Sequence, residues 1–303
     1  MRKHFSEHIE RKAKEHSDFV FVTGDLGYNA LEGVIGVMGD RFINGGVAEQ
    51  NIVGMAAGMA STGMQVICYS IAPFIVYRCL EQVRNDVCFH KQPVYMVGNG
   101  GGYGYGIMGS SHHAIEDIAV LSPLPNMMCY IPAFIDDMHH CIDAMFARRG
   151  PAYLRLGLGK NMPDGYGLTD FGLAAKANPE ARLTVLALGP VANNVFAALK
   201  EHPHRDKVEV FVINRMPMPV LPHEVSASIG RSGNILVIEE HVAIGGLASA
   251  VSLLTHENNL LVNRFQSLRA AGYPDGTYGS QAYHQQQSGL DEQNIAAVIH
   301  HYF

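Results

Sequence analysis

Short apolar runs alternate with amphipathic segments along the first half of the chain. The apolar runs are typical of buried strands and lie at 19–23, 66–69, 94–97, 127–131 and 152–156. Segments with apolar residues at helical spacing lie before and between them, at 5–16, 49–59, 74–89, 113–121 and 136–148. Strands that alternate with helices in this way predict a mainly parallel sheet with helices on both faces.

The alternation stops at 159–181, where glycines and prolines interrupt a stretch of poor periodicity. It resumes with predicted strands at 183–188, 207–213 and 234–238 and predicted helices at 190–200, 245–256 and 291–302. We therefore expect an α/β fold of two three-layer α/β/α domains with mainly parallel sheets. The first domain is predicted to cover 1–158 and the second 182–303, with 159–181 as a linker.

Composition narrows the class of protein further. A hydrophobic fraction of 48% with 17% charged residues is that of a folded globular chain and excludes a disordered one. The formal net charge of −6 argues against a nucleic-acid binder, which normally carries a basic face. Five cysteines without a CxxC pair favour buried, reduced thiols. The N-terminus starts polar and has no apolar signal core, and no apolar run is long enough to span a membrane. We therefore expect a cytoplasmic protein.

Three predicted strand ends carry the chemistry of interest, because parallel sheets bind ligands beyond the carboxyl ends of their strands. These ends lie at 24–29, 69–77 and 98–112. The last contains a glycine tract whose part 104–109 formally matches G-x-G-x-x-G. The match is weak as a dinucleotide fingerprint because no acidic residue ends the next predicted strand. We interpret the tract as a ligand-facing loop, and an NAD-dependent oxidoreductase ranks last among the alternatives.

Single residues at these ends have ordinary structural explanations. Glu49 begins an apolar helix, where a carboxylate interacts favourably with the helix dipole, and Phe74 and Tyr77 at i, i+3 are typical of core packing. The group formed by His113, Glu116 and Asp117 is typical of a capped helix start. A zinc site is not predicted, since the H-E-x-x-H order is absent and no cysteine is near.

Several segments, taken in order, resemble the pyrimidine-binding domain of thiamine-diphosphate enzymes of the transketolase group. They are 24–26, 46–51, 81–85, 112–117 and 124–126. The second half resembles the transketolase C-terminal domain at 238–241, 245–250, 273–275 and 278–280. The resemblance covers nearly the whole chain, and the ordered set is specific although each piece alone is weak.

The resemblance implies that the chain holds half of an active site. In this family thiamine diphosphate lies between two domains, one of which binds Mg2+ and the diphosphate through a Gly-Asp-Gly segment and a later asparagine. This sequence has no Gly-Asp-Gly, and its nearest match, 24–26, lies in the other domain type. We expect the C-terminal subunit of a split transketolase that moves a two-carbon ketol or acyl unit. A partner subunit would supply the Mg2+ ligands, and a heterotetramer is expected.

The resemblance also implies roles for the cofactor-binding residues. Glu49 would hydrogen-bond a ring nitrogen of the aminopyrimidine and favour the tautomer that removes the thiazolium proton. Phe74 and Tyr77 match two of the three positions around the pyrimidine ring, and Ile71 stands at the third, where the family has an aromatic residue. Between the two rings of the cofactor, the resemblance places Asp25 and Leu26. His112 matches the histidine that contacts the substrate oxygen near the reacting carbon.

Departures from the family pattern concern the substrate. Gly100 stands where transketolases have a second histidine, Met108 where they have an aspartate that reads a donor hydroxyl, and Leu158 where they have a phosphate-binding arginine. The remaining candidate substrate contacts are Asn29 at a phosphate-contacting serine, Arg2 at another phosphate-binding arginine, and the new groups Tyr103 and Tyr105. A buried polar substrate group without a partner costs about 1–3 kcal/mol, so we expect a modified or non-phosphorylated sugar as substrate.

Two alternatives remain open. The glycine tract followed by a histidine also resembles the beta subunits of 2-oxo acid dehydrogenases, and Met108 fits a donor without a hydroxyl there. The helix and C-terminal motifs favour transketolase, and a comparison of pyruvate with ketoses as donor would decide. The other alternative, a non-catalytic partner subunit, disagrees with the presence of Glu49, Phe74 and His112.

Overall fold

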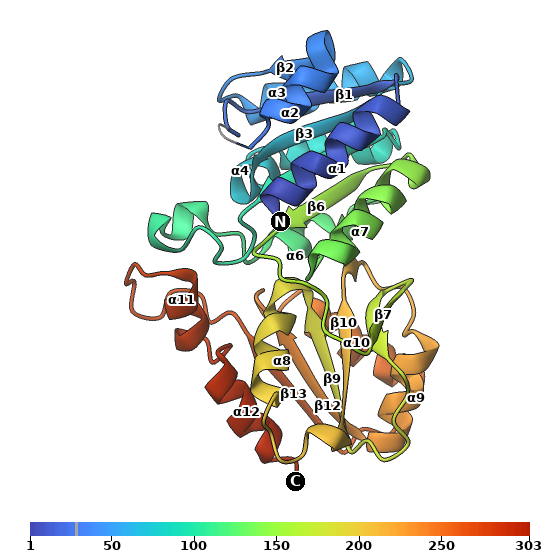
Figure 1. Cartoon of the computed structure of the whole chain (residues 1–303), viewed down its shortest axis with the longest axis vertical. Helices are drawn as coiled ribbons and strands as arrows, with labels where there is room; N and C mark the ends of the chain where they lie inside the picture. The colour runs from blue at the N-terminus through green and yellow to red at the C-terminus, as the bar shows by residue number, and fades with distance from the viewer. Residues whose placement is uncertain (28–29) are drawn as a thin grey trace.

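The computed structural model describes residues 1–27 and 30–303 and contains two sheets, one beyond the other along the long axis (Figure 1). The first sheet has the order β11-β5-β6-β4-β3-β1-β2. Its strands are β1 (Phe19–Thr23), β2 (Phe42–Asn44), β3 (Gln65–Ile71), β4 (Val94–Asn99), β5 (Met128–Tyr130), β6 (Ala152–Leu156) and β11 (Arg215–Met216). All are parallel except β11, which pairs antiparallel with β5. The predicted mainly parallel α/β sheet is confirmed.

Helices cover both faces of this sheet because successive side chains of a strand point to opposite sides. Phe19 and Phe21 of β1 join the core beneath one set of helices, whereas Val20 and Val22 join the core on the other side. The first set is α1 (Arg2–Glu15), α2 (Glu32–Met38) and α7 (Ile135–Arg148). The second set is α3 (Glu49–Ser61), α4 (Ala72–Val76), α5 (Leu80–Gln82), the π-helical turn Val83–Phe89 and α6 (Asp117–Leu121).

The second sheet has the order β13-β12-β9-β10-β8-β7. Its strands are β7 (Tyr166–Thr169), β8 (Gly172–Ala175), β9 (Leu183–Leu188), β10 (Val208–Ile213), β12 (Asn234–Glu239) and β13 (Arg264–Arg269). It packs between α8 (Ala192–Leu199) with α12 (Glu292–His300) and α9 (His223–Ser232) with α10 (Leu247–Glu257). The remaining helix, α11 (Gln281–Gln287), lies against the short helical turn Gly106–Met108 of the glycine tract (Figure 1).

The segment 159–181 differs from the predicted irregular linker. It contains the antiparallel hairpin of β7 and β8, and β8 pairs antiparallel with β10. The hairpin therefore belongs to the second sheet, and the expectation of a segment without regular elements is wrong for residues 166–175. Four-residue strands at a sheet edge with several exposed positions leave no apolar run to recognise. The domain boundary at 158 stays a prediction.

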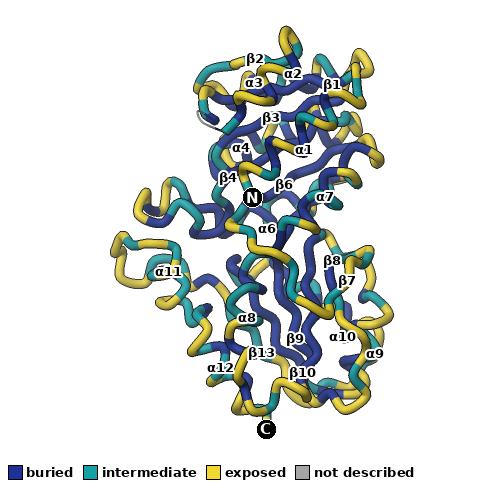
Figure 2. The backbone as a smooth tube through the Cα atoms, in the orientation of Figure 1, coloured by how far each residue is buried: buried dark blue, intermediate teal, exposed yellow. Residues whose placement is uncertain are grey.

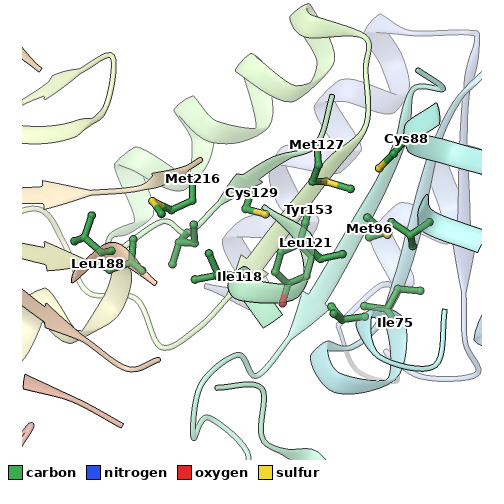
Figure 3. Packing of buried hydrophobic residues seen from close by; sticks show 14 of the residues in the cluster. Ile75, Cys88, Met96, Ile118, Leu121, Met127, Cys129, Tyr153, Leu188 and Met216 are labelled. Carbon is green, nitrogen blue, oxygen red and sulfur yellow. The ribbon is translucent and has the colours of Figure 1, made fainter. Parts of the chain in front are cut away.

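One continuous core joins the two sheets. Leu188 and Met216 belong to the same buried cluster as Ile118 and Cys129 of the first domain (Figure 3). Strand β11 reinforces this junction, since it follows β10 of the second sheet in the chain but pairs with the edge of the first. The inner strands of both sheets are buried along most of their length, while the outer strands β2, β7 and β13, the loops and the outer helix faces are more exposed (Figure 2). Within the described part of the chain, no helix combines the length and apolarity needed to cross a membrane.

Candidate active site

The three strand ends singled out from the sequence meet at one edge of the first sheet. Strands β1, β3 and β4 are neighbours, and all run parallel. Their carboxyl ends therefore lie side by side, and the segments that follow them share one surface. Helix α3 begins beside this edge with Glu49.

Glu49 is a buried carboxylate with two side-chain donors. Only 2% of the residue is exposed. Ser70 Oγ, from the end of β3, donates to Oε1 at 2.8 Å, and Arg78 Nη1 donates to Oε2 at 3.0 Å. The backbone of Gly24 closes the other side, because a Cβ added there would lie 3.6 Å from Oε1. Burial, together with the charge of Glu49, raises the pKa of Cys79 to about 12.

Arg78 connects this carboxylate to an aromatic ring, and an imidazole contacts the same ring. The guanidinium carbon of Arg78 lies 4.3 Å from the centre of the Phe74 ring, while Arg78 also contacts Glu49. The ring of His112 meets Phe74 in an edge contact with 5.1 Å between ring centres. Ser111 Oγ lies 3.0 Å from His112 Nδ1 and makes a hydrogen bond to it. Glu49, Phe74 and His112, predicted from separate segments, are thus brought together.

The other predicted cofactor residues surround this centre at the same sheet edge. Asp25 has φ of 59° and accepts a hydrogen bond from Asn44 Nδ2 at 2.9 Å, and Leu26 follows it half-buried. Ile71 is the last residue of β3 and precedes the first turn of α4. Tyr77 donates its hydroxyl to Glu116 Oε2 at 2.8 Å, and burial raises the pKa of this phenol well above its usual range.

A cavity of about 290 Å³ lies next to the glycine tract and contains two of the predicted substrate residues. Its lining residues are Met1, Arg2, Asn99, Gly100, Gly104, Tyr105, Leu156, Gly157 and Leu158. Asn99 Nδ2 donates to the Tyr105 hydroxyl at 2.8 Å. The Tyr105 ring covers Gly100, where an added Cβ would lie 2.2 Å from the ring. Tyr105 thus fills the space that a side chain at position 100 would need.

Tyr103 is not placed as the sequence predicts. It is 0% exposed, its ring stacks on His284 at 5.0 Å, and its hydroxyl donates to the carbonyl of Gly272 at 3.0 Å. The expectation of a direct substrate contact is therefore wrong in this structure, because the residue packs between the glycine tract and the second domain. Asn29, another predicted substrate contact, lies outside the described residues.

Two partners of Glu49 were missed by reasoning from the sequence. Ser70 carries no signal of its own beyond its place at a strand end. Arg78 lies four positions after Phe74, a spacing that puts two side chains of a helical segment next to each other. This spacing indicates the contact between Arg78 and Phe74. No feature of the sequence indicates that Arg78 also reaches Glu49, which is distant in the chain.

Comparisons with known proteins agree with this geometry. The family described as the transketolase pyrimidine binding domain matches residues 1–160, and the transketolase C-terminal domain matches 172–295. The chain is 31% identical over 283 residues to a protein of Phocaeicola vulgatus that is named as one subunit of an apulose-4-phosphate transketolase, covering 90% of this chain and 87% of that protein. A protein of the same name from Actinobacillus succinogenes is 30% identical over 266 residues, covering 84% and 83%.

A solved structure described as a split gene transketolase, inactive beta4 tetramer, shares the fold. It has a TM-score of 0.78 and 24% identity, covering 99% of this chain and 97% of that one. The fold and these matches together define a pyrimidine-binding domain followed by a C-terminal domain, as in the thiamine-diphosphate-dependent transketolases. The chain belongs to the transketolase family.

The residues present fit the aminopyrimidine ring of that family's cofactor. A planar group that bears N–H donors, the guanidinium of Arg78, already lies over the Phe74 ring while it hydrogen-bonds Glu49. A flat nitrogen heterocycle can make the same pair of contacts, because it too presents a face and a hydrogen-bonding edge.

Proposed function

We propose that this chain is the C-terminal subunit of a two-component transketolase that moves a two-carbon ketol or acyl unit. The observation that carries the proposal is the convergence of the Glu49 carboxylate, the Phe74 ring and the His112 imidazole at one sheet edge. The names of the relatives support the reaction, since two of them are transketolase subunits of similar length.

Each residue has a task toward the cofactor and the substrate. Glu49 holds a proton at a pyrimidine ring nitrogen, and Phe74 stacks on the ring with Ile71 and Tyr77 beside it. Thiamine diphosphate, when bound, would supply a carbon nucleophile for the carbonyl group of the donor. Asp25 and Leu26 line the space between the two rings.

His112 acts on the substrate. Its imidazole donates a hydrogen bond to the oxygen on the reacting carbon, where negative charge develops during the attack. The edge contact with Phe74 and the hydrogen bond with Ser111 fix the orientation of the ring. A fixed donor needs no reorganisation when the charge appears.

The partner is an N-terminal transketolase-like subunit that supplies the diphosphate site and the Mg2+ ligands. The relatives that are named as single subunits, rather than as whole enzymes, support this division. With two such pairs the assembly is a heterotetramer. The partner's gene is expected beside this one and to encode Gly-Asp-Gly with a downstream asparagine.

The substrate is a modified sugar. Tyr105 fills the space above Gly100, and the exposed Leu158 lines the same cavity, so the positions of the second histidine and the phosphate-binding arginine of transketolases carry no basic group. Arg2 remains as a cation at the cavity. Apulose 4-phosphate, named for the relatives, is therefore the first candidate to test, and its non-phosphorylated form is the second.

The test is complementation of two purified subunits. Neither subunit alone should transfer a two-carbon unit, and the mixture with thiamine diphosphate and Mg2+ should act on the modified sugar faster than on xylulose 5-phosphate with ribose 5-phosphate. Pyruvate serves as the competing donor. Turnover by this chain alone, or a preference for pyruvate, would contradict the proposal.

A further inference from the structure

Arg78 joins the two residues that are proposed to hold the pyrimidine ring. Its Nη1 donates to Glu49 Oε2 at 3.0 Å, and its guanidinium carbon lies 4.3 Å from the centre of the Phe74 ring. One planar group thus already occupies both the carboxylate and the aromatic ring that are proposed to hold the pyrimidine. The two sets of contacts use the same carboxylate and the same ring, so they compete for these two groups.

We propose that Arg78 is a placeholder in the pyrimidine half-site. Its guanidinium occupies the space between Glu49 and Phe74 in the free subunit and leaves both when the cofactor binds. The inference rests on the proposed function, because it names how access to that site is controlled. It adds a residue that no role in the transfer reaction requires.

The need for a placeholder follows from the burial of Glu49. Its side chain is 1% exposed, and an ionised carboxylate in such a place is unfavourable unless it is paired. Ser70 supplies one hydrogen bond to Oε1, which leaves Oε2 to Arg78. Without a cation at this position, the Glu49 carboxylate of the free chain would have no partner for Oε2.

Exchange requires the Arg78 side chain to move, and its partial exposure to solvent allows this movement. Its side chain is 43% exposed, so the stem reaches Glu49 from the surface. The guanidinium can return to water by rotation about side-chain bonds, without a change in the helix that carries Phe74. A half-buried arginine is therefore suited to a contact that has to break.

The first experiment measures the pairing in the full chain without partner or cofactor. Melting temperatures are compared for the wild type, Arg78→Ala, Glu49→Gln and the double variant, with Arg78→Gln as a milder second variant. Loss of the guanidinium should lower the melting temperature by several degrees, and by less than half as much in the Glu49→Gln background. Equal losses in the two backgrounds would overturn the pairing.

The second experiment measures the exchange. Thiamine is titrated into the isolated chain by calorimetry, with the exposed Arg84 as the matched control, since its Nη1 donates to the neighbouring Asn85. Arg78→Ala should bind thiamine at least tenfold more tightly than the wild type, and Arg84→Ala should behave as the wild type does. Binding by Arg78→Ala that is no tighter than the wild type would overturn the placeholder.

Both readouts are independent of turnover. If the two-component mixture is active but Arg78→Ala changes neither coupling nor thiamine binding, the placeholder alone fails. If the mixture is inactive while the coupling and the tighter binding are found, the proposed reaction fails and the placeholder stands.

Discussion

The carboxylate of Glu240 accepts a hydrogen bond from the backbone N–H of Tyr103 at 2.6 Å, although 137 positions separate the two residues. Glu240 follows β12 of the second sheet, and Tyr103 lies in the glycine tract of the first domain. Gln281 and Gln285 of α11 donate to the same carboxylate. The second domain thus holds the loop that carries Tyr105 and leads to His112.

Replacement of Glu240 should destabilise this junction. Glu240→Ala leaves the Tyr103 N–H and two amide groups without their acceptor in a buried place, so we expect the free energy of unfolding to fall by about 2–4 kcal/mol. Chemical denaturation measures the loss, and hydrogen exchange at the Tyr103 amide should become faster. The exposed Glu257 is the matched control, and Glu257→Ala should change neither quantity. A Glu240→Ala variant as stable as this control would show that the contact contributes nothing.

Two glycines should respond in opposite directions to alanine. A Cβ at Gly98 would lie 2.8 Å from the Tyr153 ring and 3.0 Å from the Ala72 backbone, so Gly98→Ala should cost about 1–3 kcal/mol of stability. Gly58 lies within α3 with nothing within 4 Å of an added Cβ, and Gly58→Ala should stabilise by about 0.5–1 kcal/mol. Urea titration of both variants checks the pair. Equal effects would mean that crowding does not decide the outcome at position 98.

Acid should weaken the contact between the domains through His241. Its Nε2 accepts the N–H of Ala119 at 3.2 Å and its Nδ1–H donates to the carbonyl of Val242 at 2.8 Å, an arrangement that only the neutral ring can make. Burial lowers the pKa of His241 below that of the unfolded chain, so the unfolded state binds more protons as the pH falls. The stabilising contribution is present above about pH 6.5, the ordinary pKa of histidine, and is lost as the pH falls through the lower pKa of the folded state.

The measurement compares the stability of the wild type and His241→Gln between about pH 7.5 and pH 5. The wild type should lose up to about 1.4 kcal/mol per pH unit more than the variant, which has no group to protonate there. Other buried histidines with lowered pKa values, His8 and His113 among them, titrate in both proteins and cancel in the difference. Parallel pH profiles would exclude His241 as the sensitive group.

The sequence predicted elements best where burial is complete. Residues 19–23 were expected as a strand and form β1 with the same bounds, because all five side chains are buried. Strand β13 was missed, since its sequence, from Arg264 to Arg269, is polar and largely exposed and gives no apolar run. Helix α9 was missed as well, in a stretch that opens with several prolines.

The sequence predicts those candidate site residues that stand in a recognisable motif of a single segment. Glu49, Phe74 and His112 each stand in a recognisable motif, and the parallel topology brings the three motifs together. The prediction that Tyr103 contacts the substrate is wrong because the sequence of a loop does not determine the direction in which its side chains point. Gly102, with φ of 64°, directs the chain so that Tyr103 faces the second domain while Tyr105 faces the cavity. The contact of Arg78 with Glu49 depends on how separate elements pack together, and the spacing of residues within one segment does not predict it.

Tyr105 should decide substrate preference rather than the rate of the chemical step. Its hydroxyl accepts from Asn99 in the cavity that Arg2 also lines, and its ring occupies the space above Gly100. Tyr105→Phe removes one hydrogen-bonding group, so KM for the modified sugar should rise about tenfold with kcat little changed. Tyr105→Ala should open the cavity and improve turnover of xylulose 5-phosphate relative to the modified sugar. Steady-state kinetics with both sugars measure the two effects, and an unchanged KM together with a lower kcat would assign Tyr105 to the chemical step instead.

Replacement of Glu49 should lower the rate of the chemical step. Glu49→Gln keeps the size of the side chain but cannot exchange a proton with a pyrimidine nitrogen, so kcat of the two-component enzyme should fall about 10²–10⁴-fold. The amide can still accept from Ser70 or Arg78, and the chain should therefore fold and pair with its partner. Steady-state kinetics with matched circular dichroism and subunit-association measurements separate the two effects. Full activity of a correctly assembled Glu49→Gln enzyme would remove Glu49 from the mechanism, whereas an inactive but unassembled variant would locate its role in the structure of the half-site.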